Sequence, residues 1–214
     1  SANEWAGALK PDFFAPFILG IGAFIITFSN KQKMTQKAEI AVGFGILFIG
    51  LSSMSSSIGV YQDSPVFYKA FQVLGGNPIL GILVGAVVTA IIQSSSASVG
   101  ILQTLAMRGI VNWRSAIFIT LGQNIGTCIT AILSSAGANK TAKRAAVIHL
   151  SFNVLGAAIY GVIMTIFFGI FPDLAMQHIS STQISIFHSI FNISVTILLF
   201  PFANALVKLS GLII

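Results

Sequence analysis

The chain has 214 residues, of which 55% are hydrophobic and only 7% charged. About a quarter of the residues in a soluble domain are charged. Eleven Lys and Arg with five Asp and Glu cannot cover a folded surface of this size in water, so most of that surface must face lipid or protein. This composition excludes a soluble globular domain. The net charge of +6 comes from residues between apolar runs, with no basic block, so we expect no nucleic-acid partner.

Long charge-free runs divide the chain into membrane elements. They are 13–30, 40–62, 70–107, 115–139, 145–172 and 174–207. One crossing of a bilayer needs about 20 apolar residues, so each run can cross or enter a membrane. We predict an all-α integral membrane protein whose single transmembrane domain covers 1–214. It comprises leading helices in 13–62, a re-entrant helical hairpin and a broken helix in 70–144, and trailing helices in 145–208.

The run 70–107 is nearly twice as long as one span, and the middle of it is polar. Gln93-Ser94-Ser95-Ser96 stands there with no charge or proline around it. Two half-helices, roughly 78–92 and 97–107, that meet at this polar break would have both outer ends on one side of the membrane. Such a re-entrant hairpin is tolerated only where its broken backbone is buried in protein or lines a cavity.

A second interruption is expected in the run 115–139. Gly122-Gln123-Asn124-Ile125-Gly126-Thr127 places two glycines and three hydrogen-bonding side chains in mid-span. Each glycine in a helix interior costs about 1 kcal/mol relative to alanine. The pattern predicts a discontinuous helix. A continuous helix whose small residues pack against a second helix would have the same sequence pattern.

The trailing helices carry a bend and a short repeat. After an interfacial segment that reaches about residue 183, a helix over 185–207 is expected to bend near Pro201. His-x-x-Phe-Asn occurs twice and ends at Asn153 and at Asn192. The three residues of each string share one helix face, so two helices can present the same polar corner to one place.

The polar run that begins at Gln93 is the strongest functional signal. A hydroxyl or amide left unpaired in hydrocarbon costs several kcal/mol, and several such groups are adjacent here. In one interpretation each serine donates to a carbonyl of its own helix and packs on a neighbour. In the other, the chain breaks, and the next half-helix offers free N–H groups and the positive end of its dipole to an anion. Gln93 and the unwound carbonyls would offer oxygens to a small cation.

Other polar residues are weaker candidates for ion or substrate binding. This second group consists of Gln123, Asn124, Thr127, Asn153 and Asn192. His149 and His188 are interpreted as packing residues, because no carboxylate or cysteine accompanies them as a metal ligand. All five acidic residues lie in tails or boundary loops, and no hydrolase or nucleotide-binding motif occurs, so we expect no enzyme.

The motifs together resemble the bacterial members of the type II sodium/phosphate cotransporter family. The likeness covers about 75–207 and includes Asn77-Pro78-Ile79-Leu80-Gly81, Gln93-Ser94-Ser95-Ser96-Ala97, Gly122-Gln123-Asn124-Ile125-Gly126-Thr127 and both His-x-x-Phe-Asn strings. The resemblance implies two inverted repeats, each with one QSSS, whose hairpins bind phosphate and sodium. It assigns Gln93, Ser94, Ser95 and Ser96 to substrate and ion binding. Because this chain holds one QSSS, it resembles the second repeat, which implies a homodimer or association with another repeat.

The resemblance implies sodium-coupled phosphate symport in the bacterial inner (plasma) membrane, with sodium as the coupling ion and no other cofactor or metal. Moving about two negative charges inward against about 100 mV costs roughly 4.6 kcal/mol, which co-transported cations would offset. Two alternatives remain open from the residues. One is an uncoupled anion channel, and the other is a non-transporting half-subunit that needs its partner repeat.

Overall fold

The computed structural model of the chain describes residues 11–59 and 77–214. All regular elements in these two ranges are helices, apart from an isolated β-bridge between Asn112 and His178. The all-α membrane class expected from the composition is confirmed. The chain divides into two compact units, Ser1–Val60 and Tyr61–Ile214, which are described separately below. The single transmembrane domain over 1–214 stays a prediction.

The first unit holds a helical hairpin of α2 (Pro11–Phe28) and α3 (Gln32–Gly59). The two backbones approach closely at two glycines: a Cβ on Gly22 would lie 3.0 Å from the carbonyl oxygen of Ala38, and one on Gly45 would lie 2.9 Å from that of Ala15. Small residues give membrane helices this kind of contact. Because α3 already begins at Gln32, the turn is confined to 29–31 and is shorter than the gap 31–39 between the first two charge-free runs. Residues 60–62 of the expected leading helices lie outside the described ranges.

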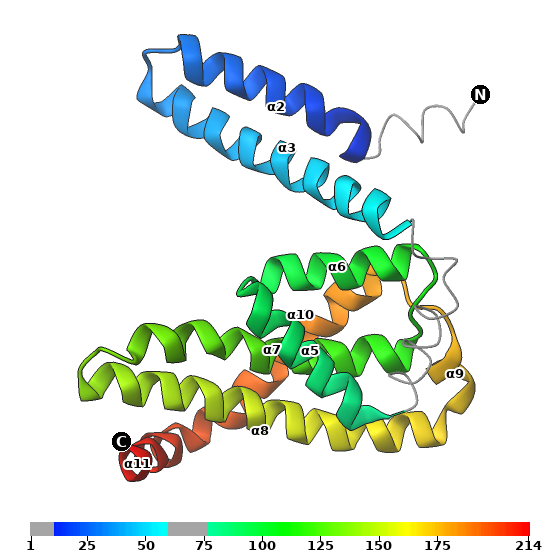
Figure 1. The fold of residues 1–214 in the computed structure, drawn as a ribbon, viewed down its shortest axis with the longest axis vertical. Helices are drawn as coiled ribbons and strands as arrows, with labels where there is room; N and C mark the ends of the chain where they lie inside the picture. Colours follow the sequence, from blue (N-terminus) through cyan, green and yellow to red (C-terminus); the bar gives the residue numbers. More distant parts are fainter. Residues whose placement is uncertain (1–10, 60–76) are drawn as a thin grey trace. The chain divides into compact units, whose positions relative to one another are not determined.

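The second unit is a helical bundle that includes a hairpin of two short helices (Figure 1). In the figure α7 and α8 run side by side in opposite directions, and α11 lies crosswise near the start of α8. The elements in chain order are α5 (Pro78–Ile92), α6 (Ser95–Met107), α7 (Trp113–Ser135), α8 (Lys140–Ile170), α9 (Pro172–Met176), α10 (Ser181–Leu199), the 3-10 turn η1 (Phe200–Phe202) and α11 (Ala203–Ile213). Residues 70–76 of the expected hairpin segment lie outside the described ranges.

Side-chain caps begin several of these helices. The Asn77 side-chain oxygen accepts from the N–H of Ile79 at 2.9 Å, and Pro78 occupies the first helical position, where no N–H is needed. Asn139 caps α8 by accepting from the N–H of Ala142 at 3.0 Å. Each cap supplies an acceptor that the helix itself lacks at its start. The caps therefore define where α5 and α8 begin.

The helix α7 lies at the centre of the second unit. All its residues from Ser115 to Asn124 are buried, whereas α8 and α10 expose many apolar side chains. Within 11–59 and 77–214, three segments are long and apolar enough to cross a membrane: Trp113–Ser135, Lys140–Ile170 and Ser181–Ile213. Shorter apolar helices cover Phe14–Phe28 and Pro78–Ile92. The exposed apolar side chains of the longer helices are suited to contact with lipid.

The expected interruption at 122–127 is wrong, because α7 is a continuous helix through these residues. A Cβ on Gly122 would overlap the carbonyl oxygen of Ile82, and one on Gly126 would overlap that of Ala86. The two glycines therefore allow α5 to lie directly against α7, and their backbone stays helical. Gly85 has the same role on α5, since its Cβ would overlap the carbonyl oxygen of Ile119.

The bend expected near Pro201 is confirmed. The chain leaves α10 at Leu199, forms the 3-10 turn η1 at Phe200–Phe202 and enters α11. Proline cannot donate the backbone hydrogen bond that would continue α10 as a straight helix. After this turn the chain continues as the separate short helix α11.

Candidate functional site

The two half-helices predicted around the QSSS string are confirmed. The helix α5 ends at Ile92, Gln93 adopts the left-handed conformation with φ of 56°, and α6 begins at Ser95. Left-handed backbone is uncommon outside glycine and marks a fixed break in the chain. The N–H of Gln93 still donates to the carbonyl of Thr89 at 2.8 Å. Figure 1 shows α5 and α6 meeting at this sharp turn. That both arms enter from one side of a membrane stays a prediction.

The break exposes the start of α6. The Ser94 hydroxyl accepts from the N–H of Ala97 at 3.3 Å, and its carbonyl accepts from Ser98 at 3.0 Å. The N–H groups of Ser95 and Ser96 come earlier in the first turn, where a helix supplies no acceptor. Gln93 and Ser96 are exposed, and Ser95 is half-buried.

These outward-facing groups have spare hydrogen-bonding capacity. Within the part of the chain that the structure describes, the side chains of Gln93, Ser95 and Ser96 have no hydrogen-bond partner. Together with two backbone N–H groups they form a compact set of donors that carries no net charge. Such a set suits a small oxyanion.

Behind the break lies an inner polar cluster of Thr89, Ser98 and Gln123. The Thr89 and Ser98 hydroxyl oxygens are 2.6 Å apart, and the Gln123 amide nitrogen donates to the carbonyl and the hydroxyl of Ser98 at 2.9 and 3.0 Å. The three residues are 0%, 1% and 3% exposed. Because they come from α5, α6 and α7, the cluster joins both arms of the hairpin to the central helix.

Two buried side-chain amide atoms, one in the inner polar cluster and one next to it in α7, lack a hydrogen-bond partner among the described residues. Among the described residues, Oε1 of Gln123 and Nδ2 of Asn124 are buried and make no hydrogen bond. The other amide atom of Asn124, Oδ1, lies 3.2 Å from Nε2 of His188 on α10. A buried polar atom without a partner is costly, so each of these atoms is a point where a bound ion or water would be favourable.

The remaining residues of the second group bond within their own helices. Thr127 donates to the carbonyl of Gln123 at 2.8 Å. The side-chain amides of Asn153 and Asn192 donate to the carbonyls of His149 and His188 at 2.9 and 2.8 Å. The two His-x-x-Phe-Asn strings thus have the same local geometry.

Both His-x-x-Phe-Asn strings face α7 at neighbouring turns. The thiol of Cys128 lies 3.6 Å from the carbonyl oxygen of His149, and Asn124, one turn earlier, contacts His188. Two trailing helices therefore do present the repeated string to the same stretch of α7. A ligand role for the two asparagines stays a prediction.

Sequence reasoning did not single out Thr89, and it included Ser98 in the polar run after Gln93 without predicting its contact with α5. Thr89 stands four residues before Gln93, and Ser98 stands four residues after Ser94. Hydroxyls one helical turn on either side of a two-residue break were the signal that could have identified them. Their contact depends on the angle of the hairpin, which a linear pattern does not specify.

Comparison with known proteins identifies the family. The Na+/Pi-cotransporter family profile matches residues 2–56 and 64–191. The chain belongs to the Na+/Pi-cotransporter family. It is therefore an integral membrane protein of a transporter family, and the resemblance drawn from the QSSS string and its surroundings is confirmed. No solved structure matches this Na+/Pi-cotransporter family chain.

Relatives of this family member come from bacteria and mammals. YqeW of Bacillus subtilis is 30% identical over 207 residues, which are 97% of this chain and 66% of YqeW. The putative inorganic phosphate export protein YjbB of Escherichia coli is 23% identical over 94% of this chain and 37% of its own length. The rat sodium-dependent phosphate transport protein 2A is 32% identical over 60% of this chain and 22% of its own length. The chain thus spans less than two thirds of the length of these relatives.

Proposed function

We propose that the chain takes part in sodium-coupled symport of inorganic phosphate, with phosphate and sodium bound at the break around Gln93, Ser94, Ser95 and Ser96. One observation carries the proposal: the left-handed turn at Gln93 opens the start of α6 and leaves serine N–H and hydroxyl groups without partners among the described residues. Family membership supports the substrate. The membrane would be the bacterial inner membrane.

The donors at the start of α6 suit phosphate. The positive end of a helix dipole and free N–H groups attract an oxyanion, and serine hydroxyls add directed hydrogen bonds. The run 70–107 contains no charged residue, so this segment itself offers no fixed positive charge at the break. Phosphate binding there therefore depends on a cation that arrives with it.

The inner polar cluster offers oxygen ligands for that cation. The unpaired Oε1 of Gln123 lies on a side chain whose amide nitrogen contacts Ser98, whose hydroxyl contacts Thr89. Hard cations prefer such carbonyl and hydroxyl oxygens. In this proposal Asn124, Thr127, Asn153 and Asn192 are secondary residues that position or extend the ion site.

Coupling follows from the lack of fixed charge. Sodium near Gln123 would raise the affinity for phosphate at α6, and phosphate would raise the affinity for sodium by the same factor. Moving about two negative charges against about 100 mV costs roughly 4.6 kcal/mol, which a sodium gradient can supply. The relatives are named for phosphate export and for sodium-dependent transport, and one coupled site serves either direction.

A second copy of this chain, or another repeat, would complete the site. Gln93 and Ser96 are exposed, and the chain spans 66% of YqeW and 37% of YjbB. An exposed hydroxyl at membrane depth needs a partner. We propose that an inverted repeat, in a homodimer or from another chain, covers these groups.

The test is phosphate uptake into vesicles that contain the purified chain. We expect uptake driven by a sodium gradient, and Ser95→Ala should lower it while Ser134→Ala, at an exposed serine near the end of α7, should not. Unchanged uptake in Ser95→Ala removes the QSSS string from the site. Flux without a sodium gradient would instead identify an uncoupled anion channel. Activity that requires addition of a partner repeat would identify a half-subunit.

A further inference from the structure

Arg144 links α8 to α11 by hydrogen bonds at one end of the second unit. Its Nε donates to the Ser210 hydroxyl at 3.2 Å, and one terminal nitrogen donates to the carbonyl of Val207 at 3.0 Å. Ser210 is fully buried and donates to the same carbonyl at 2.7 Å. A guanidinium has five N–H donors, so these two bonds orient the group and leave further donors for a ligand.

A groove lies beside this contact. It has a volume of about 290 Å³ and is lined by Thr141, Arg144, Ala145, Ile148 and Val207. Its lining changes character along α8: Thr141 and Arg144 are polar, whereas Ala145, which follows Arg144, and Ile148, one turn after Arg144, are apolar. Val207 of α11 forms the apolar wall opposite. The groove therefore has a polar end and an apolar end.

The polar end is surrounded by positive charge. Lys140, Lys143 and Arg144 stand in the first turns of α8, and Lys208 is exposed on α11. None of the five acidic residues of the sequence lies between 140 and 172 or after 173. Asp173 follows the far end of α8, about 45 Å away along a helix of 31 residues. The charge at this end is thus complementary to an anion.

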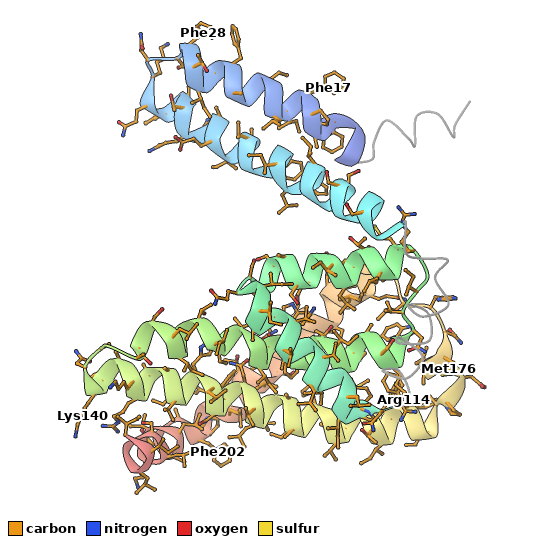
Figure 2. The ribbon with its side chains drawn as sticks, viewed as in Figure 1. Phe17, Phe28, Arg114, Lys140, Met176 and Phe202 are labelled. Atoms are coloured by element: carbon orange, nitrogen blue, oxygen red, sulfur yellow. The ribbon has the colours of Figure 1, made fainter. Side chains whose placement is uncertain are left out.

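The length of α8 would place the groove at the depth of lipid headgroups. A helix of 31 residues is about 46 Å long, longer than the roughly 30 Å hydrocarbon core of a bilayer, so the charged first turns of α8 reach the interface. Figure 2 shows Lys140 at the end of α8 near α11, with Arg114 and Met176 at the opposite end of the unit. On α11, Leu206 is buried, whereas Leu212 is 86% exposed. A crosswise helix with exposed apolar residues suits the same boundary.

We propose that the junction of α8 and α11 binds an anionic phospholipid. The phosphodiester would accept from the remaining Arg144 donors, with Lys143 and Lys208 nearby, and an acyl chain would cover Ala145, Ile148 and Val207. Basic pockets between membrane helices at the interface are suited to such headgroups. Inorganic phosphate fits the polar end of the groove but leaves its apolar end uncovered. This site is separate from the QSSS break and does not depend on the proposed transport function.

The test measures lipid retained by the purified chain in detergent. The chain is exposed to equal amounts of anionic phosphatidylglycerol and neutral phosphatidylcholine, and bound lipid is counted by native mass spectrometry. We expect phosphatidylglycerol to be retained preferentially. Arg144→Gln should lower this preference about fivefold, the effect of one basic side chain near an anionic surface. The charge-matched control Lys33→Gln, at an exposed lysine of α3, should not change it.

A second variant tests the groove without touching its charge. Ala145→Leu fills the apolar part while Arg144 keeps its bonds to α11, so it should also lower phosphatidylglycerol retention. Equal retention of the two lipids by the unchanged chain, or full retention by both variants, overturns the proposal. An equal loss in Lys33→Gln overturns it in favour of nonspecific charge attraction. Displacement of phosphatidylglycerol by millimolar inorganic phosphate would identify a free-anion site and likewise overturn the lipid assignment.

Discussion

The hydroxyl oxygens of Thr89 and Ser98 lie 2.6 Å apart and join the two arms of the hairpin behind its break. Thr89 is on α5, and Ser98 is on α6. Both are buried, and Gln123 of α7 donates to Ser98 from the other side. The position of Ser95 and Ser96 at the start of α6 therefore depends on a buried hydrogen bond as well as on the left-handed turn at Gln93.

Thr89→Val should destabilise the turn between α5 and α6. Valine has the shape of threonine without the hydroxyl, so the Ser98 hydroxyl loses that partner at a buried position. We expect a loss of about 1–3 kcal/mol in stability and lower sodium-dependent phosphate uptake. Thermal unfolding in detergent and vesicle uptake are the measurements. Thr165→Val is the matched control, because among the described residues the exposed Thr165 hydroxyl bonds only to the carbonyl of Gly161 in its own helix. Equal effects of the two variants would contradict the role given to Thr89.

The sequence was sufficient to predict the break at Gln93 but not the contacts that hold it. Several adjacent hydroxyls and an amide within an apolar run favour a break that gives them partners outside their own helix, and this pattern can be recognised from the sequence. The neighbouring string from Gly122 to Thr127 looked similar and gave the wrong prediction. Its glycines allow a close approach to α5, and only the structure shows that Ile82 and Ala86 lie opposite them.

Gly122→Ala should separate α5 from α7. Its Cβ would overlap the carbonyl oxygen of Ile82, which is backbone and cannot move alone. We expect the variant to lose about 1–3 kcal/mol of stability through overpacking, and to lose transport because the hairpin shifts. Gly169→Ala is the control, since a Cβ there meets nothing within 4 Å and should be neutral or stabilising by up to about 1 kcal/mol. A Gly122→Ala protein as stable as the Gly169→Ala protein would show that the close approach has no energetic importance.

Gln123→Ala should weaken sodium dependence. The change removes the buried Oε1 that has no partner among the described residues and also removes the amide donor to Ser98. We expect the sodium concentration for half-maximal uptake to rise about tenfold, which corresponds to a loss of roughly 1.4 kcal/mol in binding. Gln177→Ala, at an exposed glutamine, is the control and should leave the sodium response unchanged. If Gln123→Ala folds and responds to sodium as the unchanged chain does, Gln123 is not an ion ligand.

The contact between Asn124 and His188 should show energetic coupling between α7 and α10. Oδ1 of Asn124 lies 3.2 Å from Nε2 of His188, and in this amide orientation the oxygen accepts from the imidazole. A double-mutant cycle with Asn124→Ala and His188→Ala should give a coupling of about 0.5–1.5 kcal/mol in unfolding free energy. A parallel cycle with Thr165→Val in place of Asn124→Ala should give a coupling near zero.

Because His188 also belongs to the repeated His-x-x-Phe-Asn string, a measurable coupling would mean that the string helps to hold α10 against the stretch of α7 that carries Gln123. Additive effects in the first cycle would instead mean that the two side chains are neighbours without a bond that matters for stability.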